Sequence, residues 1–393
     1  MTSATRVQVS TPFWKQMLQW QLPVLDRQYL WLFTALTVLG WIMVTSASMD
    51  WADAKMHNPF AISIRHGIYI LLALLVAWFT LHFPLKMWQQ ISSVLLGVSF
   101  IGLVLVLIPG IGREVNGSIR WISLGFINFQ PSELAKIATV IYMAGYLERR
   151  KDEVQSSWMG FFKPLLVLSV LAILLLLEPD YGAVVVIMAT AMAMLFLGGV
   201  KKGQYIVTVV GMLLASVLLV VTQEYRMKRF TGYLNPWSDE NVFGSGYQLT
   251  QSLIAFGRGE WLGAGLGNSM QKLFYLPEAH TDFVFAIWSE ETGLLGSLTI
   301  IGLFVWLFIK SMRLGQQALN KQYFFAAYTA FGIALTITFQ AFINLGVNMG
   351  LLPTKGLTLP FISYGGSSLM ACAFAAALLL RIHAEVNGDK QHD

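Results

Sequence analysis

The stretch that decides the fold reads LPEAHTDFVFAIWSEETGLLGSLTIIGLFVWLFI, residues 276–309. An apolar run begins directly after Asp282 and reaches Ile309. This is long enough for a membrane-spanning helix, which needs about 20 mostly apolar residues. Asp282 is therefore predicted to lie where water meets hydrocarbon. A carboxylate is costly to keep at such a position, so it indicates a functional site.

The composition agrees with a membrane protein. Only 12% of the 393 residues are charged, against about 25% in a soluble domain, and the mean hydropathy is +0.61. The net charge of +5 does not indicate nucleic-acid binding, because the basic residues mostly flank apolar runs, as cytoplasmic anchors do. The single cysteine, Cys372, excludes an intramolecular disulfide.

Ten apolar runs predict an all-α polytopic membrane protein with ten transmembrane helices. The runs lie near residues 29–47, 67–83, 90–109, 132–147, 164–178, 181–199, 204–222, 283–309, 323–347 and 358–381. With a cytoplasmic N-terminus, fifteen Lys and Arg residues fall on the inside and six in the short outer segments. This bias predicts that both termini are cytoplasmic.

The predicted topology divides the chain into three parts. Residues 1–27 form a cytoplasmic N-terminal segment, in which residues 13–20 could be an interfacial helix or an unstructured tail. Residues 28–382 form the ten-span domain, and residues 383–393 a cytoplasmic tail. A large extracytoplasmic loop, residues 223–281, joins the seventh and eighth helices, and its length and aromatic content predict an ordered cap. Within the loop, residues 248–256 favour a short amphipathic helix, with Leu249, Leu253, Ile254 and Phe256 turned towards the membrane or the core.

Polar residues that could carry chemistry fall into four clusters, all predicted at or near the outer face. They are Glu278 with His280, Thr281 and Asp282; Arg120-Trp121 with Gln130 to Lys136; Glu178-Pro179-Asp180; and Leu352 to Gly356 with Ser363 to Ser368.

Asp282 has two interpretations. As a general base it needs an intermediate pKa and a hydroxyl within reach, and partial burial at a helix mouth would raise its pKa. As a structural residue it would cap the N-terminus of the eighth span, a place that Thr281 could fill equally well.

The basic residues of the clusters have alternatives too. Lys136 lies three residues after Glu133, so the two share a helix face and could form an ion pair, or Lys136 could meet an anionic substrate. Arg120 could hold phosphate oxygens with its planar fork or be an exposed loop residue. His280 could be a ligand, a base or a structural residue. Lys355 could hold an anion or meet lipid headgroups.

The sequence contains no phosphate-binding loop, dinucleotide fingerprint or HExxH motif. It also lacks a Cys or His cluster that would suit zinc. These observations disfavour an ATP-driven pump, and no nucleotide, haem or zinc is expected.

Together the motifs resemble those of the SEDS family (shape, elongation, division and sporulation). The resemblance runs from about residue 25 to 382, and it favours the division members over the elongation members. It is carried by Leu276 to Phe283, Pro353-Thr354-Lys355-Gly356, Ser363 to Ser368 and Gln130-Pro131-Ser132-Glu133, with Met43 to Ser48 and Phe243 to Gly259 pointing to division.

The resemblance implies a peptidoglycan glycosyltransferase that polymerises lipid II, an undecaprenyl-diphosphate-linked disaccharide-pentapeptide, with inversion into β-1,4 strands. It makes Asp282 the catalytic residue and Lys136 functionally important. The remaining substrate-binding candidates are Arg120, Glu133, Gln130, Glu278, His280, Thr281, Lys355, Ser363 and Tyr364. Division members often carry a basic residue where this chain has Asn128, so Arg120 or Lys355 would have to supply that charge.

The same resemblance implies partners and a location. We expect a divalent cation, Mg²⁺ or Mn²⁺, with Asp282 and Glu278 as candidate ligands, since carboxylates and phosphates suit such ions. A class B penicillin-binding protein, other division proteins and membrane lipid are the expected partners, at the septum in the bacterial inner membrane. Two alternatives remain, a lipid II flippase and a non-catalytic scaffold of the division machinery.

Overall fold

The computed structural model describes residues 24–115, 118–123, 125, 128–222, 224–354 and 356–388. Residues 13–20 and Lys355 lie outside them, so the predictions made there stay predictions. The helices are α2 (Arg27–Met56), α3 (Ala61–His82), α4 (Leu85–Gln90), α5 (Ser92–Leu107), α6 (Pro131–Arg149), α7 (Lys151–Ser156), α8 (Trp158–Leu177), α9 (Tyr181–Leu197), α10 (Lys202–Val221), α11 (Glu224–Leu234), α12 (Tyr247–Gly259), α13 (Val284–Asn320), α14 (Phe324–Asn348) and α15 (Gly366–Asn387).

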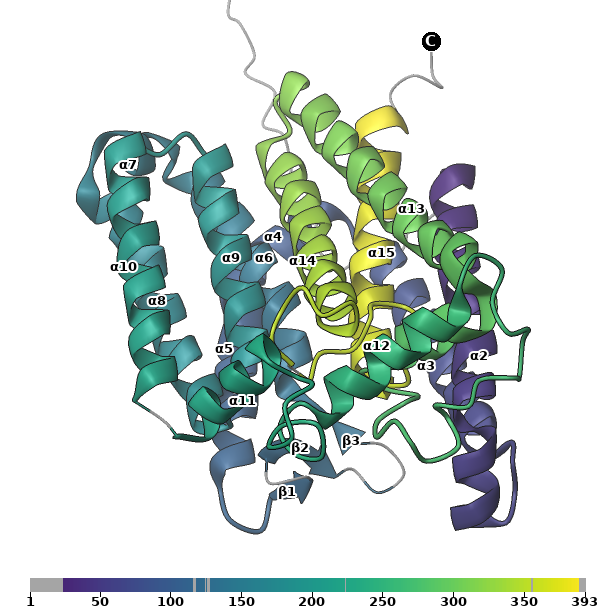
Figure 1. Cartoon of the computed structure of the whole chain (residues 1–393). Coiled ribbons are helices and arrows are strands. Elements are labelled where there is room, and N and C mark those ends of the chain that lie inside the picture. Colours follow the sequence, from purple (N-terminus) through teal and green to yellow (C-terminus); the bar gives the residue numbers. More distant parts are fainter. Residues whose placement is uncertain are drawn as a thin grey trace, which may run out of the picture.

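Long apolar helices form most of the molecule (Figure 1). Among the described residues, six helices are long and apolar enough to cross a membrane, namely α2, α3, α8, α13, α14 and α15. Three further helices are apolar but shorter, namely α5, α9 and the part of α10 from Lys202 to Leu218. The fourth predicted run corresponds to α6, which buries Glu133 and Lys136 among its apolar residues. Each of the ten predicted runs thus overlaps a helix.

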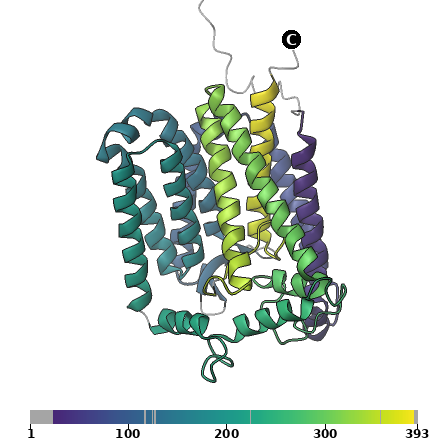
Figure 2. The same ribbon diagram turned by 45° about the horizontal axis from the view of Figure 1, so that its top comes forward.

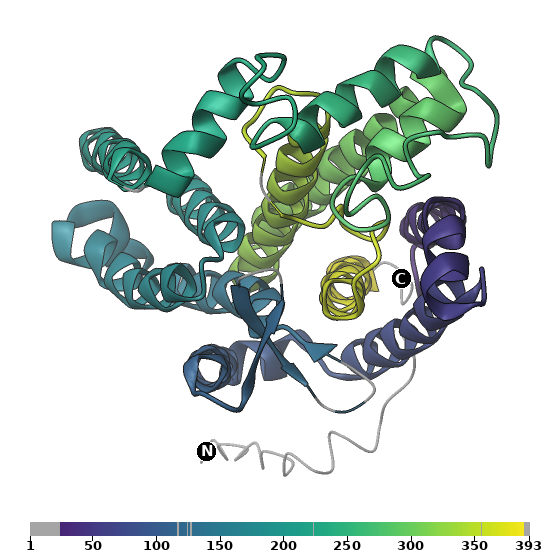
Figure 3. The ribbon, with the colours of Figure 1, turned by 60° about the horizontal axis from the view of Figure 1, so that its bottom comes forward.

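The two ends of the helix bundle differ. Asp26, which precedes α2, pairs with Lys310 of α13 at 3.0 Å and with His383 of α15 at 3.2 Å, so the start of α2 and the end of α15 lie together. At the opposite end, α11 and α12 lie across the bundle (Figure 2). Seen from that end, α15 lies near the middle of the molecule (Figure 3), where it packs against α3, α6, α13 and α14.

The all-α prediction is wrong in one detail, a small antiparallel sheet at the end that carries α11 and α12. Its strands are β1 (Gly112–Val115), β2 (Ser118–Ser123) and β3 (Asn128–Phe129), in the order β1-β2-β3. Ile122 pairs with Gly112 on one side and with Phe129 on the other. Strands of two to six residues are too short to show a clear alternation of apolar and polar residues, so these strands could not be predicted from the sequence.

The predicted eighth span, residues 283–309, is not one continuous helix. Gly293, at φ 67° and ψ −161°, breaks α13 into two segments. A Cβ added to Gly293 would lie 2.5 Å from the backbone nitrogen of Gly263, so only glycine fits this kink. The first segment carries Glu290 and Glu291 and belongs to the end of the molecule that carries α11 and α12.

The tenth predicted span begins later and ends later than expected. Residues 356–364 form no helix, although Leu359 and Phe361 are buried, and α15 starts only at Gly366 and runs to Asn387, past the predicted tail boundary at residue 383. Non-helical backbone is tolerated at membrane depth where protein surrounds it. The apolar run therefore predicted burial correctly here, but the helix predicted for residues 358–365 is wrong.

The helix predicted within residues 223–281 is confirmed as α12. Leu249 is buried and Ile254 is 38% exposed, and an apolar face turned towards the core or the membrane allows both.

Candidate active site

The second and third clusters of polar residues meet at the end of the bundle that carries the sheet. Arg120, on β2, donates from Nε to the carbonyl oxygen of Glu178 at 3.3 Å and from Nη2 to that of Pro179 at 2.5 Å. Asp180 accepts through Oδ2 from Ser132 Oγ at 3.0 Å and from Gln130 Nε2 at 3.4 Å. The start of α6 and the turn between α8 and α9 are thereby fixed to each other.

The fourth cluster joins this group to the first. Ser367 accepts from the backbone N–H of Gln130 at 2.9 Å, and the N–H of Tyr364 donates to the carbonyl oxygen of His280 at 3.1 Å. Gly356 packs against Asp282, because a Cβ built on it would lie 3.0 Å from Asp282 Oδ2. All four clusters therefore form one site, although up to about 250 residues of sequence separate them.

Asp282 is held in this site by its backbone. Its carbonyl oxygen accepts from the side-chain amides of Asn344 at 2.9 Å and Asn348 at 3.0 Å, both on α14. The helix cap of α13 is Phe283, and no side chain caps the first turn, so the interpretation of Asp282 as an N-cap is wrong. Among the described residues, no group hydrogen-bonds the Asp282 carboxyl, which leaves it available for chemistry.

The surroundings of Asp282 raise its pKa to about 7. Burial is the largest cause, since it disfavours the charged form, and the negative charge of Glu278 adds to it. Arg120 acts in the opposite direction. The residue keeps part of its surface exposed, so a substrate can reach a carboxyl that titrates near neutral pH.

Glu278 and Thr281 shape the loop before Asp282. Thr281 donates from Oγ1 to the Glu278 carboxylate at 2.6 Å and to the Glu278 carbonyl oxygen at 3.2 Å. Glu278 adopts a φ of 57°, a left-handed conformation that is uncommon for residues other than glycine. This turn holds the exposed Glu278 close enough to act on the pKa of Asp282.

Lys136 is engaged inside the protein. Its Nζ lies 2.9 Å from Glu133 Oε2 and donates to Gln340 Oε1 at 2.5 Å, and both ionic partners are buried. Gln340 in turn donates to the Thr358 carbonyl oxygen at 2.9 Å. The structure thus contains the ion pair that the sequence allowed as the alternative to substrate contact, and it links this pair to the non-helical segment before α15.

Three side-chain amides on α14 were not predicted from the sequence to belong to the site. Gln340, Asn344 and Asn348 are spaced by four residues, so they lie on one face of the helix, and all three are buried. Asn344 also donates to the Leu357 carbonyl oxygen at 2.6 Å. An i, i+4, i+8 row of amides within an apolar run was the signal that could have found them.

Glu178 is the most unusual acid of the site. It is fully buried, and among the described residues neither of its carboxyl oxygens has a hydrogen-bond partner. Burial raises its pKa to about 8, Asp180 adds to the shift and Arg120 opposes it. The neutral form is therefore favoured at pH 7, so Glu178 does not neutralise the charge of Arg120.

The remaining candidates of the first and fourth clusters have structural contacts. The His280 ring packs between Trp51 and Tyr364, with ring centroids 5.7 Å away in each case, and burial lowers its pKa. The Tyr364 ring also packs against Tyr69, with ring centroids 5.8 Å apart. Ser363 accepts from the backbone N–H of Leu359 at 2.8 Å and so fixes the turn before α15.

Two further acids lie at this end of the molecule and were also missed. Glu290 accepts from Arg258 at 2.9 Å and from the backbone N–H of Met270 at 3.0 Å. Glu291 pairs with Lys272 at 3.1 Å and accepts from Ser46 at 2.7 Å. Both acids are buried and fasten the outer loop to the first segment of α13.

The described residues contain no group of three or more His, Cys, Asp or Glu side chains arranged to hold a metal ion. Asp282 and Glu278 remain a pair of carboxylates whose charges affect each other. Such a pair suits a cation that takes its other ligands from water or a phosphate-bearing substrate.

Comparisons with known proteins agree with this architecture. The sequence model of the cell cycle proteins FtsW, RodA and SpoVE matches residues 27–388. The probable peptidoglycan glycosyltransferase FtsW of Pseudomonas fluorescens (strain SBW25) is 54% identical over 351 residues, 89% of this chain and 86% of that protein. The protein of the same name from Hahella chejuensis (strain KCTC 2396) is 54% identical over 374 residues, 95% and 94% of the two chains.

Solved structures give the same picture. The rod shape determining protein RodA of Thermus thermophilus superposes with a TM-score of 0.68 at 28% identity, covering 92% of this chain and 97% of that one. A chain from a peptidoglycan synthase complex that coordinates polymerization and crosslinking gives a TM-score of 0.76 at 27% identity, covering 92% and 98%. The resemblance to SEDS proteins is therefore confirmed, and the chain belongs to the cell cycle protein family of FtsW, RodA and SpoVE.

Proposed function

We propose that this chain is a peptidoglycan glycosyltransferase that polymerises lipid II into β-1,4 glycan strands during cell division. The names of relatives at 54% identity support this activity. The observation that carries the assignment of the site is the Asp282 carboxyl, which no described side chain engages and whose pKa is about 7. A base titrating near the working pH is efficient, because enough of it is ionised and it still binds a proton firmly.

In the proposed reaction, Asp282 removes the proton from the 4-hydroxyl of the acceptor sugar. The oxygen forms a bond to the anomeric carbon of the growing chain, and the bond to undecaprenyl diphosphate breaks, with the electron pair leaving on the diphosphate. An α-linked donor and a β-linked product require inversion, so one in-line displacement suffices. No covalent intermediate with the enzyme is needed.

Arg120 is the stronger candidate for the leaving diphosphate. Its guanidinium binds two backbone carbonyls, and among the described residues no carboxylate lies within ion-pair distance of it. Its positive charge is therefore not cancelled by an ion pair, and its fork suits phosphate oxygens. Lys136 forms an ion pair with Glu133, which neutralises its charge. We therefore propose that Lys136 positions the segment around Thr358 through Gln340.

We propose that Mg²⁺ or Mn²⁺ enters with the diphosphate. Glu278 would supply carboxylate oxygens, Asp282 would stay free to take the proton, and such an ion would offset charge on the phosphates. Polymerisation rates measured with Mg²⁺ and with Mn²⁺ decide which of the two metals is used.

The chain is a multi-pass membrane protein, as its apolar helices and its family indicate. We propose that α2, α3, α5, α6, α8, α9, α10, α13, α14 and α15 all cross the membrane. Both termini would then be cytoplasmic and the 223–281 segment would face the outside. The concentration of Lys and Arg in the predicted inner segments supports this orientation.

We also propose a class B penicillin-binding protein as partner and the division septum of the inner membrane as location. The similarity to a chain from a synthase complex that joins polymerization with crosslinking supports such a partner. Other division proteins would recruit the pair to the septum.

The test is polymerisation of lipid II by the purified full-length protein with its cognate class B penicillin-binding protein and Mg²⁺ or Mn²⁺. We expect glycan ladders from the wild type and from the control Asp152→Asn, which changes an exposed aspartate of α7. We expect none from Asp282→Asn. Ladders from Asp282→Asn would refute the base, and their absence from every protein would revive the flippase and scaffold alternatives.

A further inference from the structure

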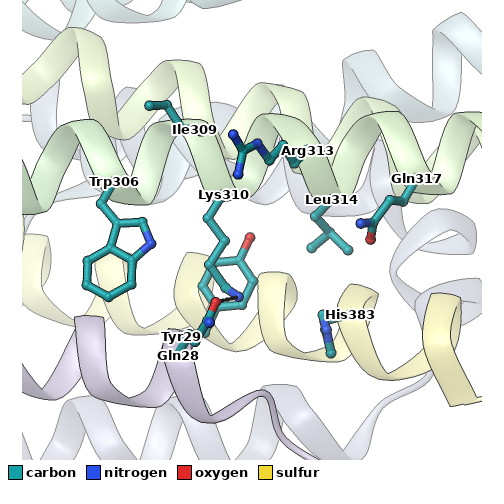
Figure 4. Close-up of a pocket in the computed structure, with 9 residues that line it drawn as sticks. All are labelled: Gln28, Tyr29, Trp306, Ile309, Lys310, Arg313, Leu314, Gln317 and His383. Carbon is teal, nitrogen blue, oxygen red and sulfur yellow. Dashed lines mark hydrogen bonds between the residues drawn. The ribbon is translucent and has the colours of Figure 1, made fainter.

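A cavity of about 220 Å³ lies at the end of the bundle opposite the candidate active site. It is formed where the start of α2 meets the last turns of α13 and α15 (Figure 4). Its lining residues are Gln28, Tyr29, Trp306, Ile309, Lys310, Arg313, Leu314, Gln317 and His383. Nothing in the proposed glycan polymerisation uses this cavity.

One wall of the cavity is a fixed polar network. Lys310 pairs with Asp26 at 3.0 Å, donates to Gln28 Oε1 at 2.8 Å and lies 4.6 Å from the centre of the Tyr29 ring. His383 Nε2 lies 3.2 Å from the other oxygen of Asp26. A single carboxylate thus serves both basic groups, and it joins α2, α13 and α15.

Arg313 adds a charge that this network does not balance. Its side chain is exposed and lines the same cavity. Among the described residues, no carboxylate forms an ion pair with it and no hydrogen bond from its side chain is present. Lys310 and Arg313 carry two positive charges, and Asp26 supplies one negative charge, so the cavity has a net positive charge. The guanidinium of Arg313 suits the binding of an anion such as a phosphate.

The other side of the cavity is apolar and faces outwards. Trp306 lines the cavity and is 41% exposed. Trp31, which lies beside the cavity, is 55% exposed, and its ring centroid is 5.4 Å from that of Trp306. Tryptophan gathers at the level of lipid headgroups. Along α13, Trp306, Lys310, Arg313 and Gln317 follow the spacing of one helix face, so the face changes from aromatic to cationic to amide towards the helix end.

We propose that this cavity binds the phosphate of an anionic phospholipid in the leaflet at this end, which is the cytoplasmic one in the proposed orientation. Arg313 would hold the phosphate oxygens, Gln317 the polar part of the headgroup, and Trp306 with the neighbouring Trp31 the start of the acyl chains, while Lys310 stays paired with Asp26 and adds its charge nearby. The volume is several times the ~30 Å³ share of one water molecule. It is below the ~300 Å³ at which pockets for small-molecule ligands begin, so it suits a headgroup and excludes a whole nucleotide.

The test is native mass spectrometry of the full-length protein in detergent, titrated with phosphatidylglycerol or with phosphatidylcholine. We expect the wild type to retain phosphatidylglycerol preferentially. Arg313→Gln should weaken that retention roughly fivefold, which is the effect of one basic residue near an anionic membrane surface. Arg313→Lys should restore part of it, because the charge returns without the fork.

The matched control is Lys202→Gln. It removes one positive charge from the start of α10, at the opposite edge of the bundle (Figure 1), and it should leave phosphatidylglycerol retention unchanged. Equal retention by Arg313→Gln and the wild type would overturn the proposal. Full displacement of the lipid by millimolar inorganic phosphate would also overturn it, because the site would then select free phosphate and not a lipid. Since Arg313 is exposed and has no described partner, its variants are expected to fold, and size-exclusion chromatography verifies this.

Discussion

Two groups of acids, at the end of the molecule that carries α11 and α12, differ in whether their carboxyl oxygens are hydrogen-bonded. Glu290 and Glu291 are buried and their oxygens are occupied by Arg258, Lys272, serine hydroxyls and backbone N–H groups. Glu178 is buried without any hydrogen bond from the described residues, and no described group bonds the Asp282 carboxyl. A satisfied buried carboxylate fastens segments together, whereas an unsatisfied one acquires a raised pKa and can exchange protons near pH 7.

The largest effect on activity is expected from a substitution of Asp282. Asp282→Asn removes the base and keeps the size of the side chain, so we expect a rate of lipid II polymerisation about 10²–10⁴-fold lower. The melting temperature should hardly change, because no described group bonds the carboxyl. A large loss of stability with a modest loss of activity would place Asp282 with the structural acids.

Glu291→Gln tests the other group. It leaves the buried Lys272 without its ionic partner, and breaking a buried pair costs about 3–5 kcal/mol. Lys272 still donates to the Gly267 carbonyl oxygen at 2.7 Å, so we expect the lower end of that range as a fall in unfolding free energy, read from thermal unfolding in detergent. Polymerisation by the protein that remains folded should stay close to that of the wild type.

Glu224→Gln is the matched control, because Glu224 and Lys228 form an exposed Glu–Lys pair on α11 at 2.7 Å. Water solvates both of its members, so no measurable change in melting temperature is expected. A loss of stability in Glu224→Gln equal to that in Glu291→Gln would show that burial is not the cause.

Gly356→Ala is expected to have the smallest effect. The added methyl would lie 3.0 Å from Asp282 Oδ2, which forces the carboxyl or the segment to shift by a few tenths of an ångström. We expect a roughly tenfold slower polymerisation, equivalent to ~1.4 kcal/mol in the barrier, without a loss of stability. Gly302→Ala on α13, where nothing lies within 4 Å, is the control and should match the wild type.

Much of the fold could be predicted from the sequence, because apolar length is a direct signal for a helix in lipid. All ten runs overlap helices, and the loop helix α12 was found by its spacing. The failures have physical causes. The kink at Gly293 depends on contact with Gly263, and the late start of α15 depends on protein surrounding a non-helical segment, and neither contact is visible in the local sequence.

The candidate site was predicted in its parts but not in its assembly. Asp282, Arg120 and Glu178 were singled out by charge in apolar surroundings, which single-residue reasoning can detect. The amides of α14 and the acids Glu290 and Glu291 were missed because they lie inside apolar runs that were read as uniform. The pairing of Lys136 with Glu133 and Gln340 is a tertiary arrangement that only the structure could show. The same holds for Glu178, whose carboxyl has no hydrogen-bond partner among the described residues.

The most direct test of the account is the pH dependence of lipid II polymerisation by the wild type and by Glu278→Gln. Asp282 must be ionised to act as a base, so the rate should rise with pH through about 7, the pKa of Asp282. Glu278 raises that pKa, so its removal should shift the rise to lower pH. A rate that does not change between pH 5.5 and 8, or a rise that stays in place in Glu278→Gln, would contradict the role of Asp282 as the base.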